Sequence, residues 1–321
     1  MSRLARRPGR LRADQGVALV LVVWGLGLIS LMILSFMIEA RLQARSAIDV
    51  ALGAEAEELA DAAFDIARSA LVVGADASSA AAGRFRHDGA PVFCTLPRGG
   101  VAEIDVADEA GKVDLNAASP KLLRRLLAGL GANGEQARAI AASIVQFRSA
   151  PTDDLGSGRR AYAAAGRDFG PKRALFETPL ELDQVLGITP RLFRRLLPLT
   201  TVSTRRAIVD PRWSPPALVA VLSGASSKTA RALLNHPFPN HVDRSGADIE
   251  ADEVGSAESP FFTIHAEVLT AAGARFVREG LVEARGASSG DAPKVKEWRR
   301  GRPHYSSALR RALGASPPAP C

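Results

Sequence analysis

The first part of the chain carries one uninterrupted apolar run. From Val17 to Ile38 there are 22 residues without a charge, and a helix of that length spans roughly 33 Å, the thickness of a bilayer's hydrocarbon core. The run is longer than the apolar region of a secretory signal, which is about 7–15 residues, and no A-x-A cleavage site closes it. The sequence therefore predicts a transmembrane helix over 17–38.

Beyond this run the apolar positions become periodic. No proline occurs between Val17 and Leu71, and the 3.6-residue period predicts one continuous helix whose second half, 39–73, is amphipathic. Two interpretations fit this pattern: a membrane anchor followed by a separate helix, or one long helix that forms the spine of a filament. The apolar or small residues recur at spacings of three, four or seven: Ile48, Leu52, Leu59, Ala63, Ile66 and Ala70.

Short alternating segments lie on either side of the middle of the chain. Segments 91–96 and 101–107 are β-rich and lie between glycine and proline residues. Further strands are predicted at 261–285, with a turn at Ala271-Ala272-Gly273, and at 293–298. Neither group alone makes a convincing sheet, so we expect four or five antiparallel strands that pack on the long helix.

The intervening block, 114–238, predicts helices arranged in three similar units. In each unit a first helix opens on a capping residue and proline and ends in glycine, and a second short helix follows. The openings are Ser119-Pro120, Thr178-Pro179 and Ser214-Pro215, and the glycines are Gly131, Gly187 and Gly224. We therefore predict an α+β fold in which an all-α domain of helix-hairpin-helix-like repeats is inserted into a discontinuous β domain, 84–113 plus 239–298.

The net charge of the whole chain is +7, and positive charge is concentrated in three parts of it. Residues 1–16 hold five arginines and one aspartate, 299–321 hold five arginines and no acid, and 114–238 hold 18 basic and nine acidic side chains. The arginine-rich segment before the apolar run should stay cytoplasmic, which places the bulk of the chain beyond the membrane. The last segment, 299–321, is interpreted as a basic flexible tail.

Reactive side chains offer little sign of an enzyme. The five histidines show no spacing typical of a nucleophile–base pair, and a metal site at His236, His241 and Asp243 would need another well-placed ligand. Two cysteines cannot build a disulfide scaffold. An oxidising compartment would permit a bond between Cys94 and Cys321, but we expect Cys94 to be buried and free.

The beginning of the chain resembles a type IV prepilin: a short basic leader, 1–16, then an apolar helix running into an amphipathic half. The resemblance implies that prepilin peptidase cuts after Gly16 on the cytoplasmic face and methylates the new amino terminus at Val17. Most prepilins have glutamate at the fifth mature position, where this chain has Leu21. That departure favours a subunit at the tip of a filament, where no other subunit lies above it.

Later stretches resemble the minor pseudopilin K family of the type II secretion system. These stretches are DEAGKVDLNAAS at 108–119, the segment 161–202, FFTIHAEV at 261–268 and KEWRR at 296–300. The resemblance implies a non-enzymatic subunit that forms a complex with minor pseudopilins I and J, caps the pseudopilus and starts its assembly for the export of folded proteins. It also implies an inner-membrane location, with one membrane pass and a periplasmic head.

Two kinds of site residue accompany this resemblance. Small residues on the apolar helix, Gly25, Gly27 and Ser30, would allow close contact with partner helices. Family members usually bind calcium through acidic runs, for which the candidates here are Asp153, Asp154 and Asp168. Arg159 and Arg160 stand where further acids would be expected. Because calcium needs about six to eight oxygen ligands, we expect no tight calcium site.

A membrane-anchored DNA receptor is the alternative function. Tandem helix-hairpin-helix units in competence proteins hold DNA through backbone amides and basic side chains, and this block has arginine pairs at 124–125 and 194–195 beside its hairpins. Against this reading, the second hairpin carries Pro190, which lacks an amide donor. Aromatic residues for stacking are absent nearby, so we consider nucleic-acid binding the weaker interpretation.

The prepilin resemblance makes a prediction about the amino terminus. Co-expression with a prepilin peptidase should yield a chain that begins at Val17 and carries one methyl group, measured by intact mass and N-terminal sequencing. The same chain expressed without the peptidase is the control and should begin upstream of Val17. A Met1 start in the presence of active peptidase would contradict the assignment to the prepilin class.

Overall fold

The computed structural model divides the chain into two compact units, Met1–Glu55 and Ala56–Cys321, which are described separately. The residues that the structure describes are 14–73, 85–150, 155–235, 254–255, 259–284, 292–314 and 318–321.

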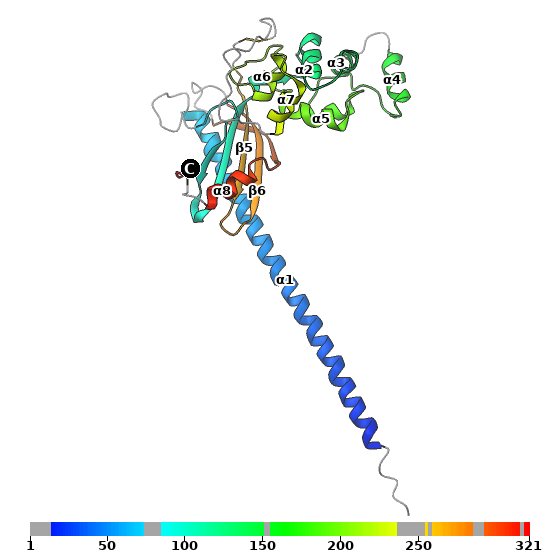
Figure 1. Cartoon of the computed structure of the whole chain (residues 1–321), viewed down its shortest axis with the longest axis vertical. Coiled ribbons are helices and arrows are strands. Elements are labelled where there is room, and N and C mark those ends of the chain that lie inside the picture. The colour runs from blue at the N-terminus through cyan, green and yellow to red at the C-terminus, as the bar shows by residue number, and fades with distance from the viewer. Residues whose placement is uncertain are drawn as a thin grey trace, which may run out of the picture. The chain divides into compact units, whose positions relative to one another are not determined.

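One helix, α1, runs without a break from Asp14 to Val73 and contributes to both units (Figure 1). This confirms the prediction of a single continuous helix. In the first unit the large apolar side chains from Val17 to Ile38 are exposed, including Trp24 at 70% and Phe36 at 78%. Within the described residues, this is the one helix long and apolar enough to cross a membrane. An apolar surface of this length has no favourable place in water, so the helix suits a single-pass anchor.

The second unit is built on a five-stranded sheet in the order β1-β2-β5-β6-β7, with every neighbouring pair antiparallel. The strands are β1 Val92–Thr95, β2 Val101–Asp108, β5 Phe261–Leu269, β6 Arg275–Glu283 and β7 Lys294–Arg300. The two predicted strand groups join where β2 pairs with β5, from Val101 opposite Leu269 to Asp108 opposite Phe262. The α+β architecture predicted from the sequence, a long helix with an antiparallel sheet, is therefore found.

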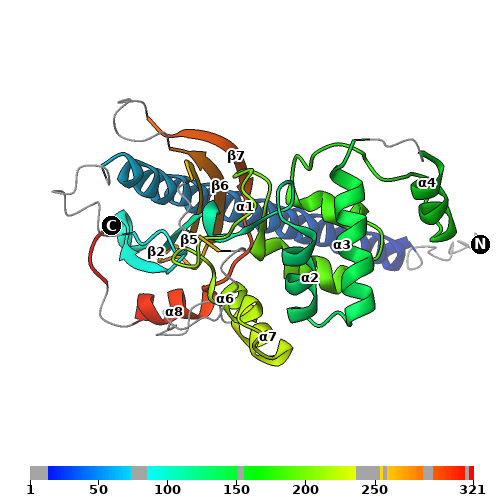
Figure 2. The ribbon, with the colours of Figure 1, turned by 90° about the horizontal axis from the view of Figure 1, so that it is seen from above.

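The part of α1 in the second unit packs on one face of this sheet (Figure 2). Four fully buried alanines let the helix backbone approach the strands closely, and Phe64 fills the space beside them. The Phe64 ring meets Trp298 edge to face at 4.6 Å between centroids. A side chain at Gly280 would clash with Phe64, so β6 requires glycine at this position. The alanines are Ala56, Ala60, Ala63 and Ala67.

A buried arginine on β6 fixes the position of α1 along the sheet. The Nε of Arg278 donates to Asp61 Oδ1 at 2.5 Å, and its Nη2 donates to Glu57 Oε1 at 2.7 Å. The guanidinium lies over the rings of Trp298 and Phe276, at 4.6 and 5.0 Å. Because Arg278 is only 6% exposed, a helix shifted by one turn would leave its charge without partners.

Between β2 and β5 lies a helical domain with a hydrophobic core of its own. Its longer helices are α2 Pro120–Gly129, α3 Gly134–Arg148 and α4 Leu155–Ala164, followed by α5 Pro190–Leu196, α6 Pro216–Leu222 and α7 Ser227–Asn235. The core gathers Leu122, Leu126, Ile144, Phe147 and Leu182 among others. A parallel pair of very short strands, β3 Val113–Asp114 and β4 Thr200–Thr201, closes the domain, and two residues per strand were too few to be predicted.

The predicted repeats are found in part. The first and third units are helix pairs, α2 with α3 and α6 with α7, and Gly131, Gly187 and Gly224 all have positive φ as expected of helix ends. The second unit instead opens on a 3₁₀ segment, η3 Pro179–Gln184, and not on an α-helix. Whether these units act as helix-hairpin-helix motifs stays a prediction.

The cap expected at Ser214 is wrong. Helix α6 begins at Pro216, and no side chain caps it. The Ser214 hydroxyl donates instead to the carbonyl of Asp210. Two successive prolines, Pro215 and Pro216, explain the difference, because they shift the first helical residue and remove amides that a cap would satisfy.

The end of the chain differs from the expected flexible tail. Strand β7 continues to Arg300, and helix α8, Ser306–Gly314, buries Leu309 against Val101 and Leu269. Cys94 is buried but not free, because it forms a disulfide with Cys321. Composition indicated disorder here, but one apolar stripe on α8 and the pairing of residues 319–321 with Thr95 order the segment.

The disulfide should contribute to stability because it closes a loop with a sequence separation of 227 residues. A chain carrying Cys94→Ser and Cys321→Ser should lose about 2–4 kcal/mol of unfolding free energy relative to the oxidised parent. Urea unfolding of the detergent-solubilised chains would measure this. Under reducing conditions the two chains should unfold alike, and an unchanged midpoint for the oxidised parent would contradict the bond's structural role.

Candidate functional site

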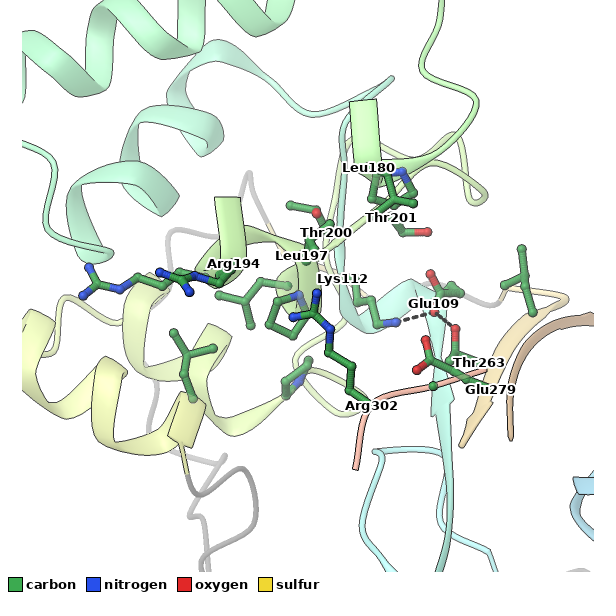
Figure 3. Close-up of a pocket in the computed structure, with 18 of the residues that line it drawn as sticks. Glu109, Lys112, Leu180, Arg194, Leu197, Thr200, Thr201, Thr263, Glu279 and Arg302 are labelled. Carbon is green, nitrogen blue, oxygen red and sulfur yellow. Dashed lines mark hydrogen bonds and ion pairs between the residues drawn. The ribbon is translucent and has the colours of Figure 1, made fainter. Parts of the chain in front are cut away.

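A cleft of about 700 Å³ lies between the helical domain and the sheet. Figure 3 shows Arg194 and Leu197 on the side of the helical domain, with Lys112, Glu109 and Thr263 opposite them. Seven basic and three acidic side chains are among the described residues that line it. Basic side chains therefore outnumber acidic ones in the lining of this cleft.

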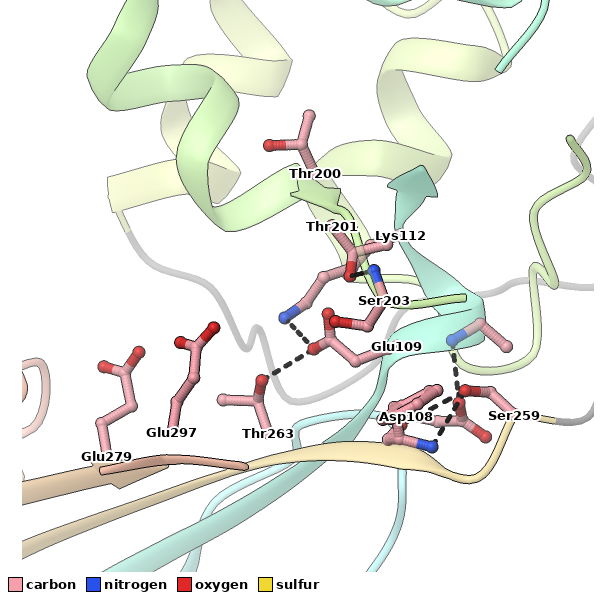
Figure 4. Close-up of polar contacts among 12 residues, drawn as sticks. Asp108, Glu109, Lys112, Thr200, Thr201, Ser203, Ser259, Thr263, Glu279 and Glu297 are labelled. Atoms are coloured by element: carbon pink, nitrogen blue, oxygen red, sulfur yellow. Dashed lines mark hydrogen bonds and ion pairs between the residues drawn. The ribbon is translucent and has the colours of Figure 1, made fainter. Parts of the chain in front are cut away.

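The segment 108–119 forms the junction between β2 and the helical domain. Asp108 ends β2 and accepts a hydrogen bond from the amide of Ala110 at 2.8 Å, which starts the short turn η2, Glu109–Gly111. Glu109 Oε1 then accepts from Lys112 Nζ at 2.5 Å and from Thr263 Oγ1 at 2.7 Å (Figure 4). The exit of β2 is thereby tied to β5, and the direction of the chain into the helical domain is fixed.

Gly111 is required by the close approach of another backbone segment. A Cβ at this position would lie 2.3 Å from the carbonyl oxygen of Trp213 and 2.7 Å from the amide nitrogen of Ser214. Neither atom belongs to a flexible side chain that could move aside. The glycine thus lets the junction pack directly on the segment that leads into α6.

Two side chains of the same segment hold distant loops together. Asp114 accepts from Thr204 Oγ1 at 2.9 Å and from the Arg205 amide at 2.7 Å. Asn116 pairs with the backbone of Phe176 in both directions, at 2.9 and 2.7 Å. These contacts give the stretch DEAGKVDLNAAS a structural explanation: its polar residues connect the sheet to the helical domain.

A second group of polar residues lies buried on the sheet face opposite α1. The β2–β5 and β5–β6 registers place Asp105 opposite His265 and His265 opposite Glu279, with Glu103 close by. His265 Nε2 lies 4.0 Å from Glu103 Oε2, and its Nδ1 lies 3.7 Å from Glu279 Oε2. Both Glu103 carboxylate oxygens and His265 Nε2 are buried and have no hydrogen-bond partner among the described residues.

Burial dominates the electrostatics of this group. It raises the pKa of Glu103 well above its usual range and that of Asp105 to about 6, although His265 and Lys112 act to lower the latter. Burial works in the same direction on Glu279, but His265 and Arg299 outweigh it and hold the pKa of Glu279 at about 2. Burial therefore favours the neutral, protonated form of Glu103 and Asp105, whereas Glu279 stays ionised beside His265 and Arg299.

Of the processing, helix-contact and calcium candidates singled out from the sequence, those that the structure describes are not among the residues of the cleft or of the buried polar group. Gly16 and Val17 are at the start of α1, and no atom lies within 4 Å of a Cβ built at Gly25 or Gly27. Ser30 is exposed on the same helix. Asp168 is exposed. The other calcium candidates, Asp153 and Asp154, lie outside the described residues, as do His236, His241 and Asp243.

His265 was overlooked because it is the only histidine in its stretch of sequence. Its partners Glu103 and Asp105 are some 160 residues away and meet it only through strand pairing. One signal was present: in 261–268 the residues that alternate with Ile264, Ala266 and Val268 are polar. On a strand covered on both sides, such alternation indicates two buried faces of different chemistry.

The buried carboxyl of Asp108 predicts a pH dependence. Burial is the main cause that raises its pKa from 3.8 to about 7, so between these values the folded chain holds a proton that the unfolded chain has lost. The free energy of unfolding should therefore fall as the pH rises from about 4 to 7. Asp108→Asn keeps the acceptor for Ala110 and cannot ionise, so it should be about 1–2 kcal/mol more stable than the parent at pH 8.

Urea unfolding at pH 5 and pH 8 would check this, with the exposed Asp168→Asn as the matched control. The advantage of Asp108→Asn should shrink at pH 5, whereas Asp168→Asn should differ little from the parent at either pH. An equal effect of Asp108→Asn at both pH values would contradict the shifted pKa.

Comparisons with known proteins agree with this architecture. Residues 104–205 match the family model described as type II secretion system (T2SS), protein K. No curated protein matches the chain. Among solved structures, the fold is similar to one chain of the crystal structure of the GspK-GspI-GspJ complex from the enterotoxigenic Escherichia coli type 2 secretion system. The identity is 20%, the TM-score is 0.52, and the similarity covers 83% of this chain and 100% of that chain. The matched residues 104–205 hold most of the junction and helices α2 to α5, so this part of the chain is similar to the type II secretion system protein K family.

Proposed function

We propose that this protein is a minor pseudopilin at the tip of the type II secretion pseudopilus, where it assembles with minor pseudopilins I and J. The observation that carries the proposal is the family match over residues 104–205, supported by a fold similar to a chain of a GspK-GspI-GspJ complex. The role is structural rather than enzymatic: the complex nucleates the pseudopilus, which exports folded proteins.

The exposed apolar half of α1 supplies the means of assembly. In a bilayer, helices associate through close packing of small residues, because lipid is as apolar as the side chains. Gly25 and Gly27 have open space around them and lie on different faces of α1, so a partner helix can approach the backbone at each of them. The arginine-rich residues before the helix keep the amino terminus cytoplasmic, and the head is periplasmic.

Two features favour the terminal position. Leu21 provides no carboxylate at the place where other subunits neutralise the amino terminus of a neighbour within the membrane, where an unpaired charge is costly. The insertion between β2 and β5 also gives the head a second domain with its own core, which is more bulk than a stacked subunit accommodates.

DNA binding is less well supported. Arg195 donates to the Leu130 carbonyl at 2.8 Å, and Arg148 donates to the carbonyls of Leu115 and Ala118. Basic side chains beside the predicted hairpins are thus used within the protein. Pro190 opens α5 and offers no amide to a phosphate.

Co-purification would test the proposal. The full chain should be co-expressed with pseudopilins I and J and prepilin peptidase, and the three should co-purify in detergent. Gly25→Leu with Gly27→Leu should lower the recovery of I and J on the order of tenfold, because bulky residues hold the helices apart. Leu26→Ile with Leu28→Ile is the matched control and should leave recovery unchanged. Absence of I and J from the purified parent chain would contradict the proposal.

A further inference from the structure

The C-terminal segment covers the buried polar group on the sheet. Glu267, in β5, accepts hydrogen bonds from the amides of His304 and Tyr305 at 2.7 and 2.8 Å, and from Ser306 Oγ at 2.8 Å. These bonds hold the start of α8 against the strands, and the His304 ring lies 5.1 Å from that of His265. The group is therefore enclosed between β2, β5, β6 and this segment.

We propose that Glu103, Asp105 and His265 form a site for a divalent transition-metal ion, with zinc the best match. One donor atom from each residue lies within 4.8 Å of the other two, so that side-chain rotation would bring all three to one ion at about 2.0–2.2 Å. Glu103 is fully buried and His265 is 4% exposed. The unpartnered polar atoms, both Glu103 oxygens and His265 Nε2, are the atoms that would ligate the ion.

Desolvation explains why these atoms need a cation. A buried carboxylate without a hydrogen bond or counter-ion is strongly unfavourable, and native proteins rarely retain one. Here the Glu103 carboxyl is such a group, Asp105 lies beside it, and Glu267 adds further negative charge nearby. A bound divalent cation would neutralise Glu103 and Asp105 at once.

The surroundings of His265 are those of a metal-binding histidine. Its Nδ1 faces the carboxylate of Glu279, which in turn pairs with Arg299. A carboxylate behind the imidazole orients the ring and directs the opposite nitrogen, Nε2, to the metal. The same face thus holds three candidate ligands and the residues that would orient one of them.

The donor set selects among metals. One imidazole and two carboxylates suit zinc, which is bound by nitrogen and oxygen in four-coordinate sites where water can complete the shell. Calcium needs about six to eight oxygen ligands, which this enclosed group does not offer. The site is also separate from the acidic residues Asp153, Asp154 and Asp168, and it does not rest on the proposed function.

Metal binding to the whole purified chain would test this inference. After chelator treatment and removal of the chelator, one equivalent of Zn²⁺ should remain bound through dialysis, measured by elemental analysis. It should also raise the melting temperature by about 5 °C or more. Glu103→Gln and His265→Gln should each abolish both effects. His87→Asn, a histidine of the same unit outside the group, is the matched control and should retain them.

A second measurement guards against loss of the fold. Glu103→Gln replaces a buried carboxyl that has no hydrogen-bond partner among the described residues with a neutral side chain of similar shape, so without metal this variant should melt at or above the temperature of the parent while binding no zinc. Co²⁺ in place of zinc should give visible absorption bands in the parent that His265→Gln lacks. The inference is overturned if the parent retains no zinc, or if zinc bound by the parent survives in both variants, which would leave His265 as a charged partner of the carboxylates only.

Discussion

The pairing of β2 with β5 is the contact on which the other features depend. It joins residues 101–108 to residues 262–269 over eight positions, and everything between them in sequence must leave and return at the same end of the sheet. The insertion of the helical domain follows from this pairing. So does the separation of the two sheet faces, because one register assigns Ile104, Ile264 and Ala266 to α1 and Glu103, Asp105 and His265 to the other side.

The long helix, the strands and the division into a sheet and a helical block could be predicted from the sequence, because each depends on local periodicity and on glycine and proline. The residues that bring the parts together could not. Glu109 and Thr263 meet across 154 positions of sequence, and Arg278 meets Asp61 across 217. No local pattern marks such partners, since each is one charged or polar residue among many.

The candidate site shows the same limit more sharply. The resemblance to a family directed attention to acidic residues in the helical block, whereas the structure gathers carboxylates and a histidine on the sheet. The prediction of a flexible tail over 299–321 is wrong for a related reason. The composition of this tail is that of a disordered segment, but two contacts order it: Leu309 of α8 packs on Val101 and Leu269, and Cys321 forms a disulfide with Cys94 of β1. Each contact involves a residue far away in sequence.

The end of the chain also affects how the sheet meets its surroundings. Thr95 of β1 exchanges backbone hydrogen bonds with Ala319 and Cys321, so the outer side of this edge strand is already occupied there. The opposite edge, β7, carries Lys294, Lys296 and Arg299, charges that discourage another strand from pairing with it. Occupation of one edge and charge at the other thereby discourage the sheet from pairing with further strands. Reduction of the disulfide would release one of these two safeguards and expose β1 to strand addition by other extended chains.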